Sequence, residues 1–314
     1  MSAELASKYS NYKKWLRRRH LDNDTWVLNW DLQQNQFAEF GNGDSLFSTA
    51  IFLTALMLEK NEAEAGALLR AVNTQKYSQG MYPRYYDKFN TSKDQYYPFL
   101  TALIYGHLLF PKNALFKETL HEIIQAVKGH NYNLKNPDGS NSEHGDMNGF
   151  RSIFAMVEGR PTSSFFLSMW ISPNYSSVIN LAERSYFNNF MMACHYLMCH
   201  VYATGFIKRW CLKKSVGSFA KRNSNNPFIL MVRDLIFGDK QYQTEVENIL
   251  RIFSAEHLPN DKDDLAHSDV LWQRDPRNWP NPKVELRHEY AGIDYMILYQ
   301  FYERYYLGDE KLSR

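Results

Sequence analysis

Acidic residues stand at the expected starts of two helices in this chain. Asp44 directly precedes the apolar segment 45–60, and Asp94 lies in the first turn expected for the next long helix. Two carboxyl groups that face one substrate can serve as general acid and general base. A structural role is open for both residues, because an acid in the first turn of a helix also stabilises the helix dipole.

The polar loop 140–148 gathers Glu143, His144 and Asp146 within four residues. Such a loop could provide a base, a ligand-binding acid or a cation ligand. Its spacing lacks the i, i+4 pair of a helical metal site, so we predict no metal here. The alternative is a solvated turn whose side chains cap nearby backbone groups.

Two further loops offer groups that could hold a ligand. Arg84 and Tyr86 lie in a Tyr-rich loop, and a guanidinium can donate to a carboxylate or to hydroxyl groups. Trp272, Arg274 and Trp279 offer flat stacking faces and a positive charge. An ordinary Arg–Asp loop pair and hydrophobic anchoring of a long loop are the competing interpretations.

Cysteine and histidine residues cluster at 194–200, but their pattern favours packing over chemistry. Cys194, His195, Cys199 and His200 do not share one helical face, and their neighbours are apolar. We therefore predict a buried helix and no cofactor. The odd total of 3 cysteines and the absence of an apolar N-terminal segment lead us to expect a cytoplasmic protein without a signal peptide.

Composition excludes some partner classes. With 36 Lys and Arg against 34 Asp and Glu, the net charge of +2 gives no basis for binding nucleic acid. We expect no membrane partner either, because polar residues interrupt the apolar stretch 187–207. The basic run at 13–19 is interpreted as a solvated helix face, with surface binding as the alternative.

Helical periodicity dominates the chain, so the predicted fold class is all-α. Helices are predicted at 45–60, 63–72, 93–110, 115–128, 149–157, 176–206, 227–237, 241–255 and 290–306. Ser92 and Gln95 match a capping box, Asn61 is a predicted cap, and the segment 137–139 is a turn signature. The recurring helix–loop–helix rhythm predicts a superhelical stack or a closed ring of paired helices.

Four segments resemble the (α/α) toroid carbohydrate-active proteins. They are GDSLFSTAIFLTAL, GMYPRYYDKFNTSKDQYYPFLTALIYG, VLWQRDPRNWP and GIDYMILYQFY, together about a fifth of the chain. The resemblance implies a single domain over 1–314, an (α/α)6-type toroid, with 1–40 as an N-terminal helical and loop extension. It also implies a glycoside hydrolase or a polysaccharide lyase, although terpenoid cyclases and non-enzymes share this fold.

We therefore expect a glycoside hydrolase with paired carboxylates in an aromatic-lined cleft at one face of the toroid. The expected catalytic residues are Asp94, Asp44 and Asp146, and the expected substrate-binding residues are Arg84, Tyr86, Glu143, His144, Trp272, Arg274 and Trp279. Two alternatives stay open: a lyase with a Tyr or His base beside Arg84, and a non-catalytic helical binding or scaffold protein. A carbohydrate or another small molecule is the expected ligand.

Overall fold

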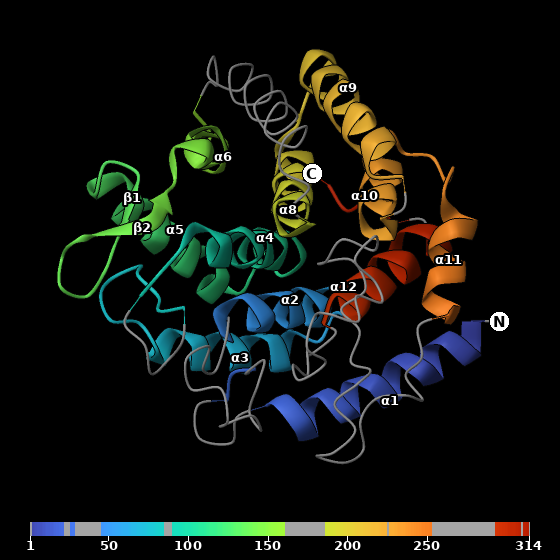
Figure 1. Cartoon of the computed structure of the whole chain (residues 1–314), viewed down its shortest axis with the longest axis horizontal. Coiled ribbons are helices and arrows are strands. Elements are labelled where there is room, and N and C mark those ends of the chain that lie inside the picture. The colour runs from blue at the N-terminus through green and yellow to red at the C-terminus, as the bar shows by residue number, and fades with distance from the viewer. Residues whose placement is uncertain are drawn as a thin grey trace, which may run out of the picture.

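The structure is a computed structural model that describes residues 2–21, 26–28, 45–84, 90–160, 186–224, 226–252, 293–308 and 310–313. Within these ranges it contains eleven α-helices and one two-stranded sheet (Figure 1). The predicted all-α class is therefore confirmed.

The helices are α1 (Ser2–His20), α2 (Ser45–Leu58), α3 (Glu62–Thr74), α4 (Lys93–Leu109), α5 (Ala114–Gly129), α6 (Arg151–Val157), α8 (Tyr186–Tyr202), α9 (Phe206–Arg222), α10 (Pro227–Phe237), α11 (Gln243–Ile252) and α12 (Ile293–Phe301). A 3-10 turn, Asn148–Phe150, precedes α6, and a π-helical segment, Tyr302–Leu307, continues α12. The strands are β1 (Asn133–Lys135) and β2 (Asn141–Asp146).

Local sequence rules account for several helix boundaries. The side chain of Asn61 accepts a hydrogen bond from the backbone N–H of Glu64 at 3.3 Å, as the predicted cap of α3. Helix α10 begins at Pro227, where a missing N–H has no cost, and ends at Gly238 with a φ of 72°. The predicted bounds of this helix are confirmed.

Five helices surround the centre of the molecule. Helix α2 contacts α4, α4 contacts α8, α8 contacts α10, α10 contacts α12, and α12 contacts α2 (Figure 1). The remaining helices pack outside them, with α3 against α2, α5 against α4, and α9 against α10 and α8. Inner and outer helices alternate along much of the chain, which explains why almost continuous apolar sequences such as α2 alternate with amphipathic ones such as α5.

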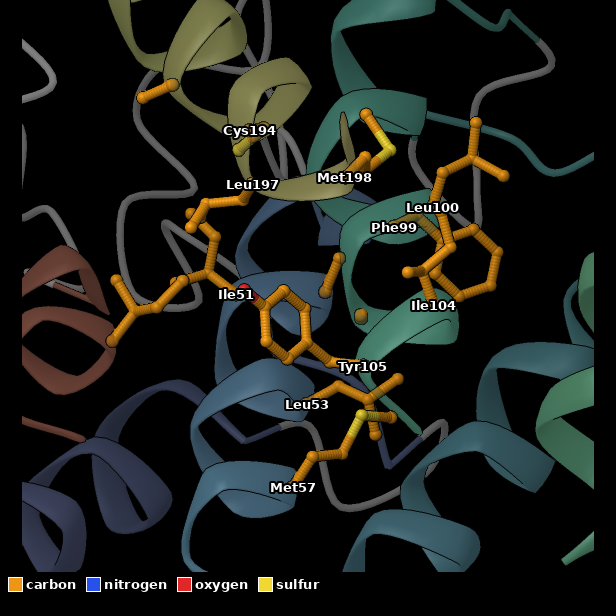
Figure 2. Packing of buried hydrophobic residues seen from close by; sticks show 14 of the residues in the cluster. Ile51, Leu53, Met57, Phe99, Leu100, Ile104, Tyr105, Cys194, Leu197 and Met198 are labelled. Atoms are coloured by element: carbon orange, nitrogen blue, oxygen red, sulfur yellow. The ribbon is translucent and has the colours of Figure 1, made fainter. Parts of the chain in front are cut away.

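The inner helices are largely buried. All residues of α2 are buried, as its nearly uninterrupted apolar sequence predicts. Figure 2 shows side chains from α2, α4 and α8 packed together, including Ile51, Tyr105 and Leu197, each at most 1% exposed. The centre of the described helices is thus filled by side chains and is not an open channel.

The beginnings of four inner helices meet at one end of this core. The Phe47 and Phe190 rings, near the starts of α2 and α8, have their centroids 5.5 Å apart. Phe190 stacks in turn on Phe228 of α10 at 5.2 Å. The first turn of α4 joins the same end, because the side chain of Gln95 accepts a hydrogen bond from the backbone N–H of Phe47 at 2.9 Å.

Helix α1, which lies in the predicted N-terminal extension, belongs to the core. Its Tyr9 ring stacks on Tyr299 of α12 at 4.5 Å, and its Tyr12 is fully buried. The predicted solvated basic face is correct for exposed residues such as Lys14. It is wrong for Lys13, which pairs with Glu59 of the segment after α2.

Two predictions about local structure need correction. The polar loop predicted at 140–148 contains strand β2, which pairs with β1 in an antiparallel hairpin. Its turn is the predicted one, with Gly139 at a φ of 83° and Asp138 accepting from the Ser140 backbone N–H at 2.9 Å. The helix predicted over 176–206 is described from Tyr186 and ends at Tyr202, and the separate helix α9 that follows it was not predicted.

Candidate functional site

Segments from four parts of the chain meet around the first turn of α4. The backbone N–H of Tyr82 donates to the Tyr96 hydroxyl at 2.9 Å, which fixes the segment before Arg84 against α4. The hydroxyl of Ser142, on β2, donates to the carbonyl of Thr91 just before α4. Through Gln95, α4 is also joined to the start of α2. The loop before Arg84, the hairpin and the start of α2 therefore all meet the first turn of α4.

Gln95 has a tertiary role that its local sequence does not predict. The predicted capping box is wrong, because Ser92 makes no side-chain cap hydrogen bond in the N-cap position of α4. The side-chain oxygen of Gln95 instead accepts a hydrogen bond from the backbone N–H of Phe47. This N–H lies in the first turn of α2, where backbone N–H groups have no partner within their own helix. The cause is burial, since an unsatisfied N–H at a buried helix start costs more than a solvated one.

Asp94 lies in the first turn of α4 and is half-buried. Its neighbour Gln95 is fully buried, so the carboxyl group stands at the edge between core and solvent. Among the described residues its carboxylate makes no hydrogen bond or ion pair. It is therefore available to a ligand, in addition to its favourable position at the positive end of the α4 dipole.

The hairpin carries the other described acids of the expected site. Glu143, His144 and Asp146 are exposed on β2, while Ser142 and Gly145 face inward. Asp146 accepts hydrogen bonds from the backbone N–H and side chain of Asn148 at 2.9 and 2.7 Å. Such bonds are those expected if the segment is a turn whose side chains cap nearby backbone groups. They occupy one oxygen of the Asp146 carboxylate.

The remaining expected site residues are distributed as follows. The Arg84 carbonyl accepts from the backbone N–H of Leu46 at 3.5 Å, so Arg84 lies beside the first turn of α2. Asp44, Tyr86, Trp272, Arg274 and Trp279 lie outside the described residues. The structure thus brings Arg84, Asp94 and the hairpin to the same end of the core.

A buried aromatic layer lies behind the hairpin. The ring of Tyr97, one turn after Asp94, is 4.4 Å from the ring of Phe150 and 6.4 Å from that of His195. Burial lowers the pKa of His195 to about 4, and neither ring nitrogen has a hydrogen-bond partner among the described residues. Burial likewise raises the pKa of the Cys199 thiol to about 12. The predicted burial of this segment is confirmed for Cys194, His195 and Cys199.

A small hollow lies beside the start of α2. Its lining includes Ser45, Thr49, Val72 and Tyr82, but not Asp94. Most of its wall is apolar, which does not suit a sugar ring with its many hydroxyl groups. Within the described ranges, His, Cys, Asp and Glu side chains form no group of three that could hold a metal ion. No described helix is long and apolar enough to cross a membrane.

No protein-family model, no curated protein and no solved structure matches this chain.

Proposed function

We propose that the chain is a carbohydrate-active enzyme, a glycoside hydrolase whose site lies at the end of the core where the inner helices begin. Asp94 is the proposed general acid, and Asp44 is its proposed partner. Arg84 and the hairpin residues Glu143 and His144 would bind the hydroxyl groups of the substrate.

The arrangement of the helices supports an (α/α) toroid as the framework. The cycle of contacts through α2, α4, α8, α10 and α12 is what a ring of inner helices produces, and the alternating outer helices fit the same plan. The cycle has five members among the described helices, one fewer than an (α/α)6 toroid requires. Residues 161–185, outside the described ranges, separate α6 from α8 in the sequence.

The observation that carries the enzymatic proposal is the position of Asp94. Its carboxylate has no hydrogen-bond or ion-pair partner among the described residues, so its oxygens are available to a substrate. An exposed carboxylate could be an ordinary solvated surface acid, and one bonded to backbone N–H groups could be a helix cap. Asp94 is half-buried, and Ser92 rather than Asp94 occupies the N-cap position of α4.

The alternative is a non-catalytic helical binding protein, and one comparison separates it from the proposed function. The Asp94→Asn variant and the matched variant Glu245→Gln each remove one charge from the first turn of a helix, in α4 and α11 respectively. The chain is assayed against a panel of aryl glycosides and oligosaccharides. We expect Asp94→Asn to lower turnover by about 10²-fold or more, the usual contribution of a general acid, and Glu245→Gln to leave it unchanged.

Thermal unfolding of both variants is measured in parallel. A hydrolase with Asp94 in the site retains nearly all its stability in Asp94→Asn, because no described bond is lost. Full activity of Asp94→Asn, or equal losses in the two variants, would refute the assignment.

A further inference from the structure

Helix α9 presents a surface that the proposed function does not use. Its inner face, Leu212, Val216, Phe219 and Ala220, is buried against α8 and α10. Its first turn projects from the molecule at the periphery (Figure 1), and there Phe206, Ile207 and Trp210 are 82%, 59% and 52% exposed. Large apolar side chains grouped at such exposure mark an interaction surface.

The same helix is strongly basic. Its 17 residues include Lys208, Arg209, Lys213, Lys214, Lys221 and Arg222 and no acidic residue. Lys214 lies with its ammonium 5.9 Å from the centre of the Trp210 ring, and Lys221 is exposed further along the helix. At 100° per residue, Ile207, Trp210, Lys214 and Lys221 point to one side. Apolar tip and positive charge therefore share one outward face.

We propose that this outward face of α9 binds the surface of an anionic lipid bilayer. Lys214 and Lys221 would attract the acidic headgroups, and Ile207 and Trp210, with the adjacent Phe206, would insert at the level of the headgroups. An indole ring suits this depth, because it has an apolar body and a polar N–H. This proposal departs from the expectation of no membrane partner, which considered only segments that span a bilayer.

Charge and side-chain type favour a bilayer over the other occupants of such a face. A second copy of the chain would bring an equally basic helix against the first, and like charges at an interface are unfavourable. A single-stranded nucleic acid would use Trp210 and Phe206 for stacking, but Ile207 has no aromatic face. Insertion into lipid uses all three apolar side chains and the basic residues together.

The test is co-sedimentation of the full chain with vesicles of phosphatidylcholine, alone or with about 30% phosphatidylserine. We expect binding to the anionic vesicles only, and weakening of this binding as salt increases. Replacing both Lys214 and Lys221 with Gln should lower the partition coefficient about 25-fold, at about fivefold for each basic residue. Trp210→Ser should lower it about tenfold or more.

Matched controls come from exposed residues elsewhere in the chain. Trp26 is 60% exposed, and Lys112 and Lys117 are exposed beside and on α5. Trp26→Ser and the double variant Lys112→Gln, Lys117→Gln should bind vesicles as the unmodified chain does. Far-ultraviolet circular dichroism and urea unfolding verify that all variants fold.

Four results would overturn the proposal. They are absence of binding to anionic vesicles, equal binding to neutral vesicles, equal weakening by the control variants, and a dimer or a nucleic-acid complex that Trp210→Ser disrupts while vesicle binding is unaffected.

Discussion

Two buried tyrosines should respond in opposite ways when they lose their hydroxyl groups. Tyr105 of α4 is 0% exposed and Tyr82 is 1% exposed, so both rings lie in the core. The Tyr82 hydroxyl donates to the side-chain oxygen of Asn73 at 2.6 Å. The Tyr105 hydroxyl has no hydrogen-bond partner among the described residues, although burial raises its pKa.

The magnitudes follow from these environments. A buried hydroxyl without a partner costs about 1–3 kcal/mol, and Tyr105→Phe removes that cost. The small cavity left by the missing oxygen atom lowers the free energy of unfolding by only about a few tenths of a kcal/mol. Tyr105→Phe should therefore raise the free energy of unfolding by about 1–2 kcal/mol. Tyr82→Phe should lower it by about 0.5–1.5 kcal/mol, because it deletes one made bond.

Urea unfolding followed by circular dichroism measures both effects. We expect the midpoint to increase for Tyr105→Phe and to decrease for Tyr82→Phe, with the m-value unchanged in both. If Tyr105→Phe destabilises the chain as much as Tyr82→Phe does, the Tyr105 hydroxyl has a partner in solution and the packing described here around α2, α4 and α8 is wrong.

Two further predictions use the same measurement. Gln95→Met keeps the shape of a fully buried side chain but removes the acceptor for the Phe47 N–H, so it should lower the free energy of unfolding by about 1–3 kcal/mol. The control Gln75→Met changes a half-exposed side chain and should alter the free energy of unfolding by no more than about 0.5 kcal/mol. Equal losses in the two variants would contradict the link between α2 and α4. His195 has a folded pKa of about 4, below its unfolded value of about 6.5, so its contribution to stability is complete above pH 6.5 and is lost as the pH falls toward 4. The free energy of unfolding should fall by roughly 3 kcal/mol over this range, and His195→Gln should abolish that fall. If the free energy of unfolding of His195→Gln depends on pH as that of the unmodified chain does, His195 is not buried in its neutral form.

Local patterns in the sequence predicted the inner helices well. Helix α2 is apolar on all sides and α10 has a cap, a first-turn Pro and a terminal Gly, so each is specified by residues within its own segment. The apolar pattern also identified the buried cluster around Cys194 and Cys199. In these cases the local signal and the tertiary environment agree.

Features that depend on distant partners could not be predicted. The motif at Ser92 and Gln95 is a local signature, but a backbone N–H 48 positions earlier in the chain competes for the Gln95 side chain. Helix α9 was missed because Phe206, Ile207 and Trp210 lie on a different side from Leu212 and Val216, which hides the single apolar stripe of an ordinary surface helix. The apolar residues on the side away from the core are also the ones that form the proposed interaction surface of α9.

For the candidate site, the sequence identified acids at helix starts but not their surroundings. It placed Asp94 in the first turn of a helix, which the structure confirms. It gave no sign that Ser142 would anchor the hairpin to Thr91, or that Asp146 would cap Asn148. Such contacts arise from packing between segments far apart in the chain, and helical periodicity does not specify them.

The most direct test of the proposed hydrolase is the separation of the Asp94 and Asp44 carboxyl groups in a crystal structure of the chain. Asp44 directly precedes α2, whose start is joined to the first turn of α4 through Gln95. The proposal predicts that both carboxyl groups face one cleft, about 5–5.5 Å apart for a retaining enzyme or about 6.5–9.5 Å apart for an inverting one. Carboxyl groups that point to separate surfaces, or that lie well beyond about 10 Å from each other, would contradict it.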